Sequence, residues 1–112
     1  AKLYFSGTIY YDANQNLDTV KNAMIGALDT FVSTIPLGGT PLAADQSGVS
    51  WAEALAKVAQ VAGVLNVALT TFSFLSSDGV HPDSPNDLLM TINQVAILVK
   101  DAPWPQFTWV AI

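Results

Sequence analysis

The residues whose side chains could best take part in catalysis or metal binding lie in one short segment. His81 is the only histidine of the chain, and Asp78, Asp83 and Asp87 lie close to it in sequence. Imidazole and carboxylate groups serve as metal ligands and as general acids or bases. Their spacing here matches neither a calcium loop nor another recognised ligand pattern. We therefore interpret the segment as a solvated turn and expect no metal, no cofactor and no catalytic residue.

Two further segments have a superficial likeness to functional motifs. Asp45-Gln46-Ser47-Gly48 lacks the leading glycine of a nucleophile elbow, and we expect a loop there. Gly38-Gly39 is followed by no Lys or Arg and by no immediate helix, so a phosphate-binding loop is disfavoured. The pair instead predicts a turn with positive φ after a helix. The chain also has no cysteine and thus no thiol chemistry, so we do not expect an enzyme.

The charge balance bears on the class of partner. Four lysines, and no arginine, oppose nine carboxylates, which gives a formal net charge of −5. Binding to a phosphate backbone needs clustered basic residues. Nucleic acid is therefore not an expected partner.

The chain is unusually apolar and sparsely charged. Hydrophobic residues make up 51% of it and charged residues 12%, which is about half the usual charged fraction. A small domain cannot bury so much apolar surface alone. We infer that other chains, or further parts of the same polypeptide, cover some of its surface. The alternative is a surface of uncharged polar residues.

A charge-free stretch, residues 58–77, is long enough to cross a bilayer. Seven polar side chains interrupt it and Gly63 divides it into two periodicities, so we expect no membrane insertion. The N-terminus shows no signal-peptide pattern.

The first predicted helix spans Leu17 to Ile35. Apolar residues recur on it at three- and four-residue steps, which indicates one buried face. Asn16 is the expected N-cap, Asp18 suits the first turn, and Pro36 ends the helix at or before Ile35.

The second predicted helix follows Ser50. Ser50-Trp51-Ala52-Glu53 forms a capping box, in which the side chains of Ser50 and Glu53 satisfy each other's backbone N–H groups. Gly63 is expected to end the helix in a left-handed conformation. The predicted buried stripe consists of Trp51, Leu55, Val58 and Ala62.

Three segments are predicted as strands: 3–11, 64–74 and 107–112. In the first, Leu3, Phe5, Ile9 and Tyr11 share one face. Residues 88–99 are ambiguous, because 88–90 could open a helical turn or pair as a strand. We favour extended structure from about Gln94, and a loop over 75–87.

These elements predict a single α+β domain over residues 1–112. It is expected to be a two-layer sandwich in which a sheet of about three strands is covered on one face by two helices, in the order β-α-α-β-β.

Aromatic residues near the C-terminus are candidates for an interface. Trp104 lies between two prolines and is expected to stay outside regular structure, where it could anchor a partner. Phe107 and Trp109 could do the same or could simply close the sheet over the helices. Tyr4 and Tyr10, on the sheet face away from the helices, are further candidates.

Three runs carry a resemblance to a known family: residues 20–28, Ile35-Pro36-Leu37-Gly38-Gly39 and residues 62–67. Together they resemble the baseplate J-like family of contractile-tailed phages and related injection systems. In that family a helix leads to a "P.GG" turn, and a second helix ending in "GV..V" feeds a strand. Residues 93–98 also resemble the segment before the family's last strand. The resemblance spans most of the chain and corresponds to the C-terminal domain of a much longer protein.

The resemblance implies a structural role. Such proteins form baseplate wedges in the virion tail, assembled in the bacterial cytoplasm. The partners that the resemblance implies are other baseplate or tail proteins, with copies of the same chain as a further candidate. It implies no catalytic residue; the residues that match are Pro36, Gly38, Gly39 and Gly63, which shape turns. Leu98-Val99-Lys100 departs from the family, which often has a glycine-containing turn there. The alternative is a small ligand-binding or adhesion module that uses the 75–87 loop.

Overall fold

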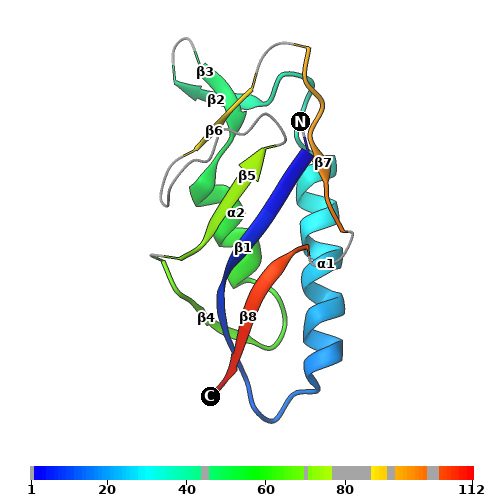
Figure 1. Ribbon diagram of the computed structural model, residues 1–112, viewed down its shortest axis with the longest axis vertical. Helices are drawn as coiled ribbons and strands as arrows, with labels where there is room; N and C mark the ends of the chain where they lie inside the picture. Colours follow the sequence, from blue (N-terminus) through cyan, green and yellow to red (C-terminus); the bar gives the residue numbers. More distant parts are fainter. Residues whose placement is uncertain (1, 44–45, 70, 77–86, 91–92, 101–103) are drawn as a thin grey trace.

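A long strand at the N-terminus organises the protein. This strand is β1 (Lys2–Tyr11). The computed structural model describes residues 2–43, 46–69, 71–76, 87–90, 93–100 and 104–112; at 43 and 73–76 it describes the backbone alone. The chain continues through α1 (Leu17–Ser33), β2 (Thr40–Ala43), β3 (Gln46–Val49), α2 (Trp51–Ala59), β4 (Val64–Val67), β5 (Ser73–Ser76), β6 (Leu88–Leu89), β7 (Ile97–Leu98) and β8 (Gln106–Ala111). Figure 1 shows β1 crossing the middle of the molecule, with β8 beside it. The predicted α+β class is confirmed.

The main sheet consists of β1 and four shorter strands along its two edges. β4 and β5 pair with β1 antiparallel, whereas β7 and β8 pair with it in parallel. The carbonyls of Leu3 and Tyr11 accept from the N–H groups of Val99 and Ile112, at 3.0 and 2.9 Å, and the Thr8 carbonyl accepts from Ala68 at 3.0 Å. Odd and even residues of a strand direct these groups to opposite edges. β1 therefore lies between two outer rows of strands: β4 and β5 follow one another along one edge, and β7 and β8 along the other. The sheet has five strands, so the prediction of about three is wrong in its count.

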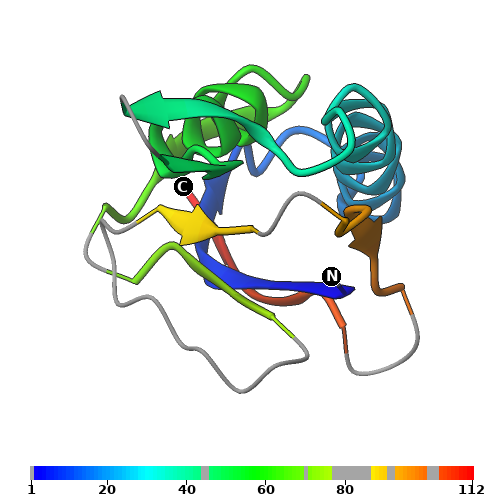
Figure 2. The same cartoon turned by 90° about the horizontal axis from the view of Figure 1, so that it is seen from above.

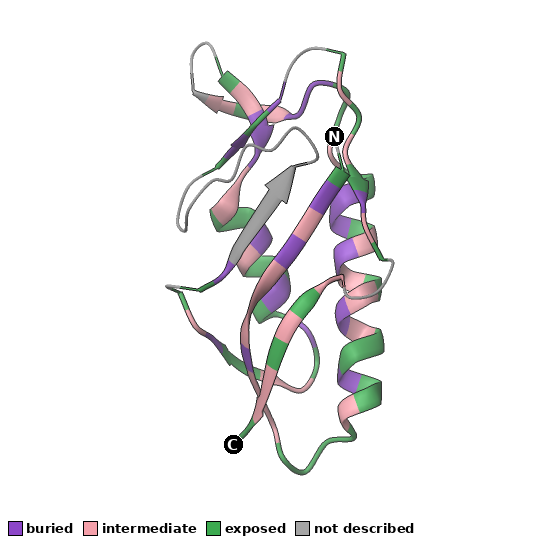
Figure 3. Ribbon diagram, in the orientation of Figure 1, coloured by how far each residue is buried: buried purple, intermediate pink, exposed green. Residues whose placement is uncertain are grey.

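Both helices cover the same face of this sheet, as predicted (Figure 2). Between the layers, Leu3, Phe5 and Ile9 of β1 meet Met24 and Leu28 of α1, and all five side chains are fully buried. Burying one such side chain contributes about 1.5–3 kcal/mol. Figure 3 shows the purple, buried positions alternating along β1 and recurring along the inner side of α1. The main core thus lies between β1 and α1.

Helix α1 begins and ends where the sequence predicts. The Asn16 side chain accepts a hydrogen bond from the Thr19 N–H at 3.2 Å, and Asp18 lies in the first turn. The helix ends at Ser33, two residues before Ile35. Gly38 and Gly39 follow with φ of 81° and 90°, which confirms the positive-φ turn.

Helix α2 starts at the predicted cap, since the Ser50 hydroxyl accepts from the Glu53 N–H at 3.3 Å. Its last residue is Ala59, and Gly63, with φ of 90°, ends the turn that follows instead of the helix itself. The predicted buried stripe is partly wrong. Ala62 is exposed and Trp51 and Leu55 are half-buried, while the buried residues near Val58 are Ala54 and Val61.

A second, smaller sheet at one end of the molecule was not predicted. It has the order β2-β3-β6, and β3 includes three of the four residues of Asp45-Gln46-Ser47-Gly48. The expectation of a loop is therefore wrong from Gln46 onward; Asp45 lies outside the described residues. A Cβ on Gly39 would come within 2.4 Å of the Gly48 backbone, and one on Gly48 would overlap the Leu88 carbonyl. Strand β3 forms because glycines let its neighbours approach closely.

The predicted strand over 64–74 is interrupted. β4 ends at Val67, the chain turns through the described residues 68, 69, 71 and 72, and β5 begins at Ser73. Phe72 is fully buried at this break, and a Cβ on Gly7 would lie 3.1 Å from the Phe72 Cα. Gly7 therefore leaves room for Phe72 to pack over β1, which splits the outer row.

The ambiguous segment 88–99 forms two short strands among its described residues. Leu88 pairs with Val49 in β6, and Leu98 pairs with Leu3 in β7. Extended pairing from about Gln94 is thus confirmed at β7, and the alternative of a helical turn at 88–90 is wrong. Long-range pairing with β3 decided this outcome.

Candidate interaction surfaces

The face of the main sheet away from the helices carries the two tyrosines predicted as contacts. Tyr4 and Tyr10 alternate with the buried residues of β1 and are half-buried. The ring of Tyr4 packs edge-on against that of Trp104, with centroids 5.1 Å apart. Trp104 lies outside regular structure, immediately before β8, as predicted. Tyr4 and Trp104 therefore form one aromatic pair, while Tyr10 lies further along the strand.

Lys2 lies on the same face at the start of β1, but from Tyr4 to Tyr10 the described positions that the register places there carry no charged side chain. In addition to the tyrosines, Ser6 and Thr8 of β1 lie there, with Thr108 of β8 beside Thr8. Aromatic and hydroxyl side chains on a pleated surface suit contact with another surface better than a charged face does, because no ion must lose its water.

Phe107 and Trp109 lie on the other face. They pair in parallel register with Gly7 and Ile9, so their side chains point toward the helix layer. Their rings pack edge-to-face with centroids 6.0 Å apart, and Trp109 also contacts the ring of Tyr11. Both are half-buried against the core. The interpretation that they close the sheet over the helices fits this placement.

A groove runs between these aromatic residues and α1. Its volume is about 270 Å³. The residues that line it are Lys21, Met24 and Ile25 of α1, with Trp104, Pro105, Phe107 and Trp109 of the β8 segment. Three of the five predicted interface residues thus meet in one groove, which the sequence did not predict because its walls come from opposite ends of the chain.

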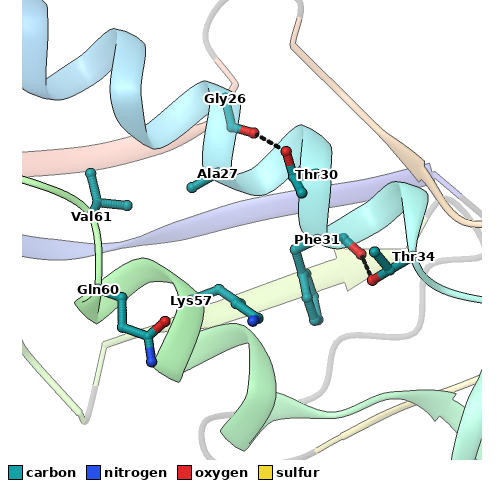
Figure 4. A pocket seen from close by; sticks show the side chains of 8 residues that line it. All are labelled: Gly26, Ala27, Thr30, Phe31, Thr34, Lys57, Gln60 and Val61. Carbon is teal, nitrogen blue, oxygen red and sulfur yellow. Dashed lines mark hydrogen bonds between the residues drawn. The ribbon is translucent and has the colours of Figure 1, made fainter.

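A second groove lies between the two helices, on the side away from the sheet (Figure 4). Its volume is about 390 Å³ and its walls include Gly26, Thr30, Lys57 and Gln60. The hydroxyl of Thr30 donates to the Gly26 carbonyl at 3.0 Å, so it is already engaged. A Cβ on Gly26 would meet no atom within 4 Å. This groove is open, and of the described residues that line it only Lys57 is charged.

Of the segment around His81, the structure describes Asp87 but not residues 77–86. His81, Asp78 and Asp83 lie outside the described residues. Asp87 is described, and its carboxylate accepts a hydrogen bond from the Trp51 N–H at 2.7 Å, at the start of α2. Asp87 therefore has a structural role at the N-terminus of that helix. No group of three or more metal-ligating side chains occurs among the described residues.

The structure also shows exposed apolar residues that sequence patterns did not single out. Among the described residues, the large apolar side chains that expose more than half of their surface are Leu37, Leu65, Leu69, Leu89, Val95, Ile97 and Ile112. Several come from β6, β7 and the turn after α1, at the end of the molecule with the second sheet (Figure 1). The excess of apolar residues inferred from composition is thus partly on the surface.

Comparison with known proteins adds no assignment: no protein-family model matches the sequence, and no curated protein matches it significantly. Neither helix in the described part of the chain is long and apolar enough to span a lipid bilayer. The charge-free stretch 58–77 instead contributes to the end of α2, to β4 and to β5.

Proposed function

We propose that this chain is a structural component of a phage or prophage tail baseplate, a wedge domain that mediates protein-protein assembly without catalysis. The observation that carries the proposal is the role of the segments that resemble the baseplate J-like family. They contribute α1, the Gly38-Gly39 turn, the turn after α2, and β4, and their characteristic residues shape these turns. A protein whose recognisable residues are structural suits a role in assembly.

The surfaces support the same proposal. The sheet face away from the helices carries no charged side chain among its described positions from Tyr4 to Tyr10. An aromatic groove lies beside β8, and large apolar side chains are exposed at both ends of the molecule. Protein interfaces are enriched in aromatic residues and depleted of charge at their centres. The expected partners are other baseplate or tail proteins in the virion, with further copies of this chain as an additional partner.

The proposal is tested in the bacterium that encodes the chain. An epitope-tagged copy is expected to co-purify with sheathed tail particles and to be labelled at the baseplate end in electron micrographs. Deletion of the gene is expected to abolish sheathed tails. Tail-sheath, tube and lysozyme-like hub genes should lie nearby. Intact, fully active particles without the chain, or a location in a metabolic operon, would contradict the role.

A further inference from the structure

The outer edge of β8 has hydrogen-bonding groups that no described strand uses. The Ile112 N–H donates to Tyr11, and the Ile112 carbonyl accepts from the Ala13 N–H, at 2.9 and 3.1 Å. Even-numbered residues of this strand therefore face β1. Since hydrogen-bonding groups alternate along a strand, the N–H and C=O groups of Phe107, Trp109 and Ala111 point to the outer edge.

This edge also lacks the usual protection against pairing. Natural proteins cover edge strands or place lysine, proline or a bulge on them. The six residues of β8, Gln106 to Ala111, include no charged residue and no proline, and their register with β1 is continuous. β8 is the longest strand after β1, so its edge is a template for another strand.

The aromatic groove lies directly beside this edge. Figure 1 shows the lower half of α1 running alongside the outer side of β8, and Figure 2 shows α1 above the sheet. A strand added to β8 would run beneath α1, with alternate side chains directed toward Met24, Ile25 and Trp109. A strand edge combined with a helix-walled apolar groove is the geometry of peptide recognition by strand addition.

We propose that β8 and α1 bind an extended segment of another protein as an added strand, with alternate apolar residues in the groove and a carboxylate near Lys21. Among the described residues that line the groove, Lys21 alone is charged, so charge complementarity favours an acidic segment. The inference rests on the proposed assembly role for its biological meaning and deepens it by naming the docking mode.

A second copy of this chain is a poorer occupant. Two-fold pairing of β8 with another β8 would bring the α1 helices of both copies to the same side of the joined sheet, where α1 already lies beside the edge (Figure 1). It would also bring two Lys21 side chains together. A single extended segment avoids both conflicts.

The test uses the purified chain and octapeptides selected on it from a random displayed library. In the free protein, the amides of Thr108 and Val110 should exchange with deuterium slowly and those of Phe107, Trp109 and Ala111 quickly. The selected peptides should carry alternating apolar residues and an acidic residue. A synthetic copy should slow exchange at the three odd-numbered amides and shift the resonances of Met24 and Ile25.

Two protein variants and one control sharpen the result. Ala111→Pro removes an outward N–H without removing a bond to β1, and should weaken peptide binding about 5- to 10-fold. Lys21→Glu should select basic peptides in place of acidic ones. Lys57→Glu, an equal charge change outside this groove, should leave the affinity unchanged.

Three outcomes would overturn the proposal. In the first, the selection enriches no peptide. In the second, the enriched peptides slow deuterium exchange at other amides. In the third, a higher protein concentration alone slows exchange at the odd-numbered amides of β8, which would identify a second copy as the occupant. Peptide binding needs no tail particle, so its failure would leave the baseplate role standing. Absence of the chain from particles would leave the peptide result standing.

Discussion

At the scale of single residues, glycines and short polar side chains determine where elements end and how closely they approach. Gly63 adopts φ of 90° beside Val20, and Asn16, Ser50 and Asp87 satisfy N–H groups at helix starts. Gly26 is different, because it lies inside α1 and a Cβ there would meet nothing. Local geometry therefore accounts for Gly63, and nothing in the described structure requires glycine at position 26.

Replacing these two glycines by alanine should have opposite effects. Gly26→Ala should raise the free energy of unfolding by about 0.5–1 kcal/mol, because glycine is unfavourable inside a helix. Gly63→Ala should lower it by about 1 kcal/mol or more, because φ is positive and the new Cβ would lie 2.7 Å from the Val20 side chain. Urea unfolding of both variants measures the difference. Equal losses in the two variants would contradict this account.

Asp87→Ala should destabilise the protein by about 1 kcal/mol, because the Trp51 N–H loses its acceptor at the start of α2. The matched control is Asp29→Ala. Asp29 pairs with Lys100 at 3.1 Å, but both side chains are about half exposed. Its loss should cost no more than about 0.5 kcal/mol. Thermal unfolding measures both, and an equal effect would show that Asp87 does not act as a cap.

At the scale of elements, Trp51 joins α2 to the turn between β4 and β5. Its indole N–H donates to the Phe72 carbonyl at 2.8 Å, and the two rings lie 6.0 Å apart. Phe72 in turn packs over Gly7 of β1. One side chain thus connects the second helix to the break in the outer row of the sheet.

Trp51→Phe should keep most of the packing but leave the Phe72 carbonyl without its donor. We expect a loss of about 1–3 kcal/mol in the free energy of unfolding. Trp104→Phe is the control. The new phenylalanine ring can still pack against Tyr4, and this ring contact does not depend on a hydrogen bond. Denaturant unfolding compares the two. A smaller effect at Trp51 than at Trp104 would contradict the importance of the indole hydrogen bond.

At the scale of the whole molecule, both helices cover the same face of the sheet, and exposed apolar side chains lie at the ends of the molecule. Leu37, Leu89, Val95 and Ile97 are each more than half exposed. With a net charge of only −5 on 112 residues, charge repulsion offers limited protection against association. These features suit a protein that functions while packed against neighbours.

The isolated chain should therefore self-associate as its concentration rises, with a corresponding increase in sedimentation coefficient. The double variant Leu37→Gln and Val95→Gln should weaken this association without lowering stability, because both side chains are exposed. Lys57→Glu is the charge control and should have little effect. A monomer at every concentration would contradict this prediction.

The sequence alone determined the features that depend on neighbouring residues. Helix periodicity and the side chains of Asn16 and Ser50 predicted both helix starts, and Pro36 predicted the end of α1. Alternation in residues 3–11 predicted which face of β1 is buried. These effects act over a few residues, so they can be read directly from the chain.

The tertiary structure decided what depends on contacts between distant segments. Gln46–Val49 carries weak strand signals and becomes β3 because β2 and β6 pair with it. Phe72 interrupts the outer row because Gly7, far away in sequence, leaves space for it. The groove between α1 and β8 likewise exists because parallel pairing places Phe107 and Trp109 beneath a helix from the other end of the chain. Strand pairing is cooperative and non-local, and for that reason local patterns did not reveal the candidate site.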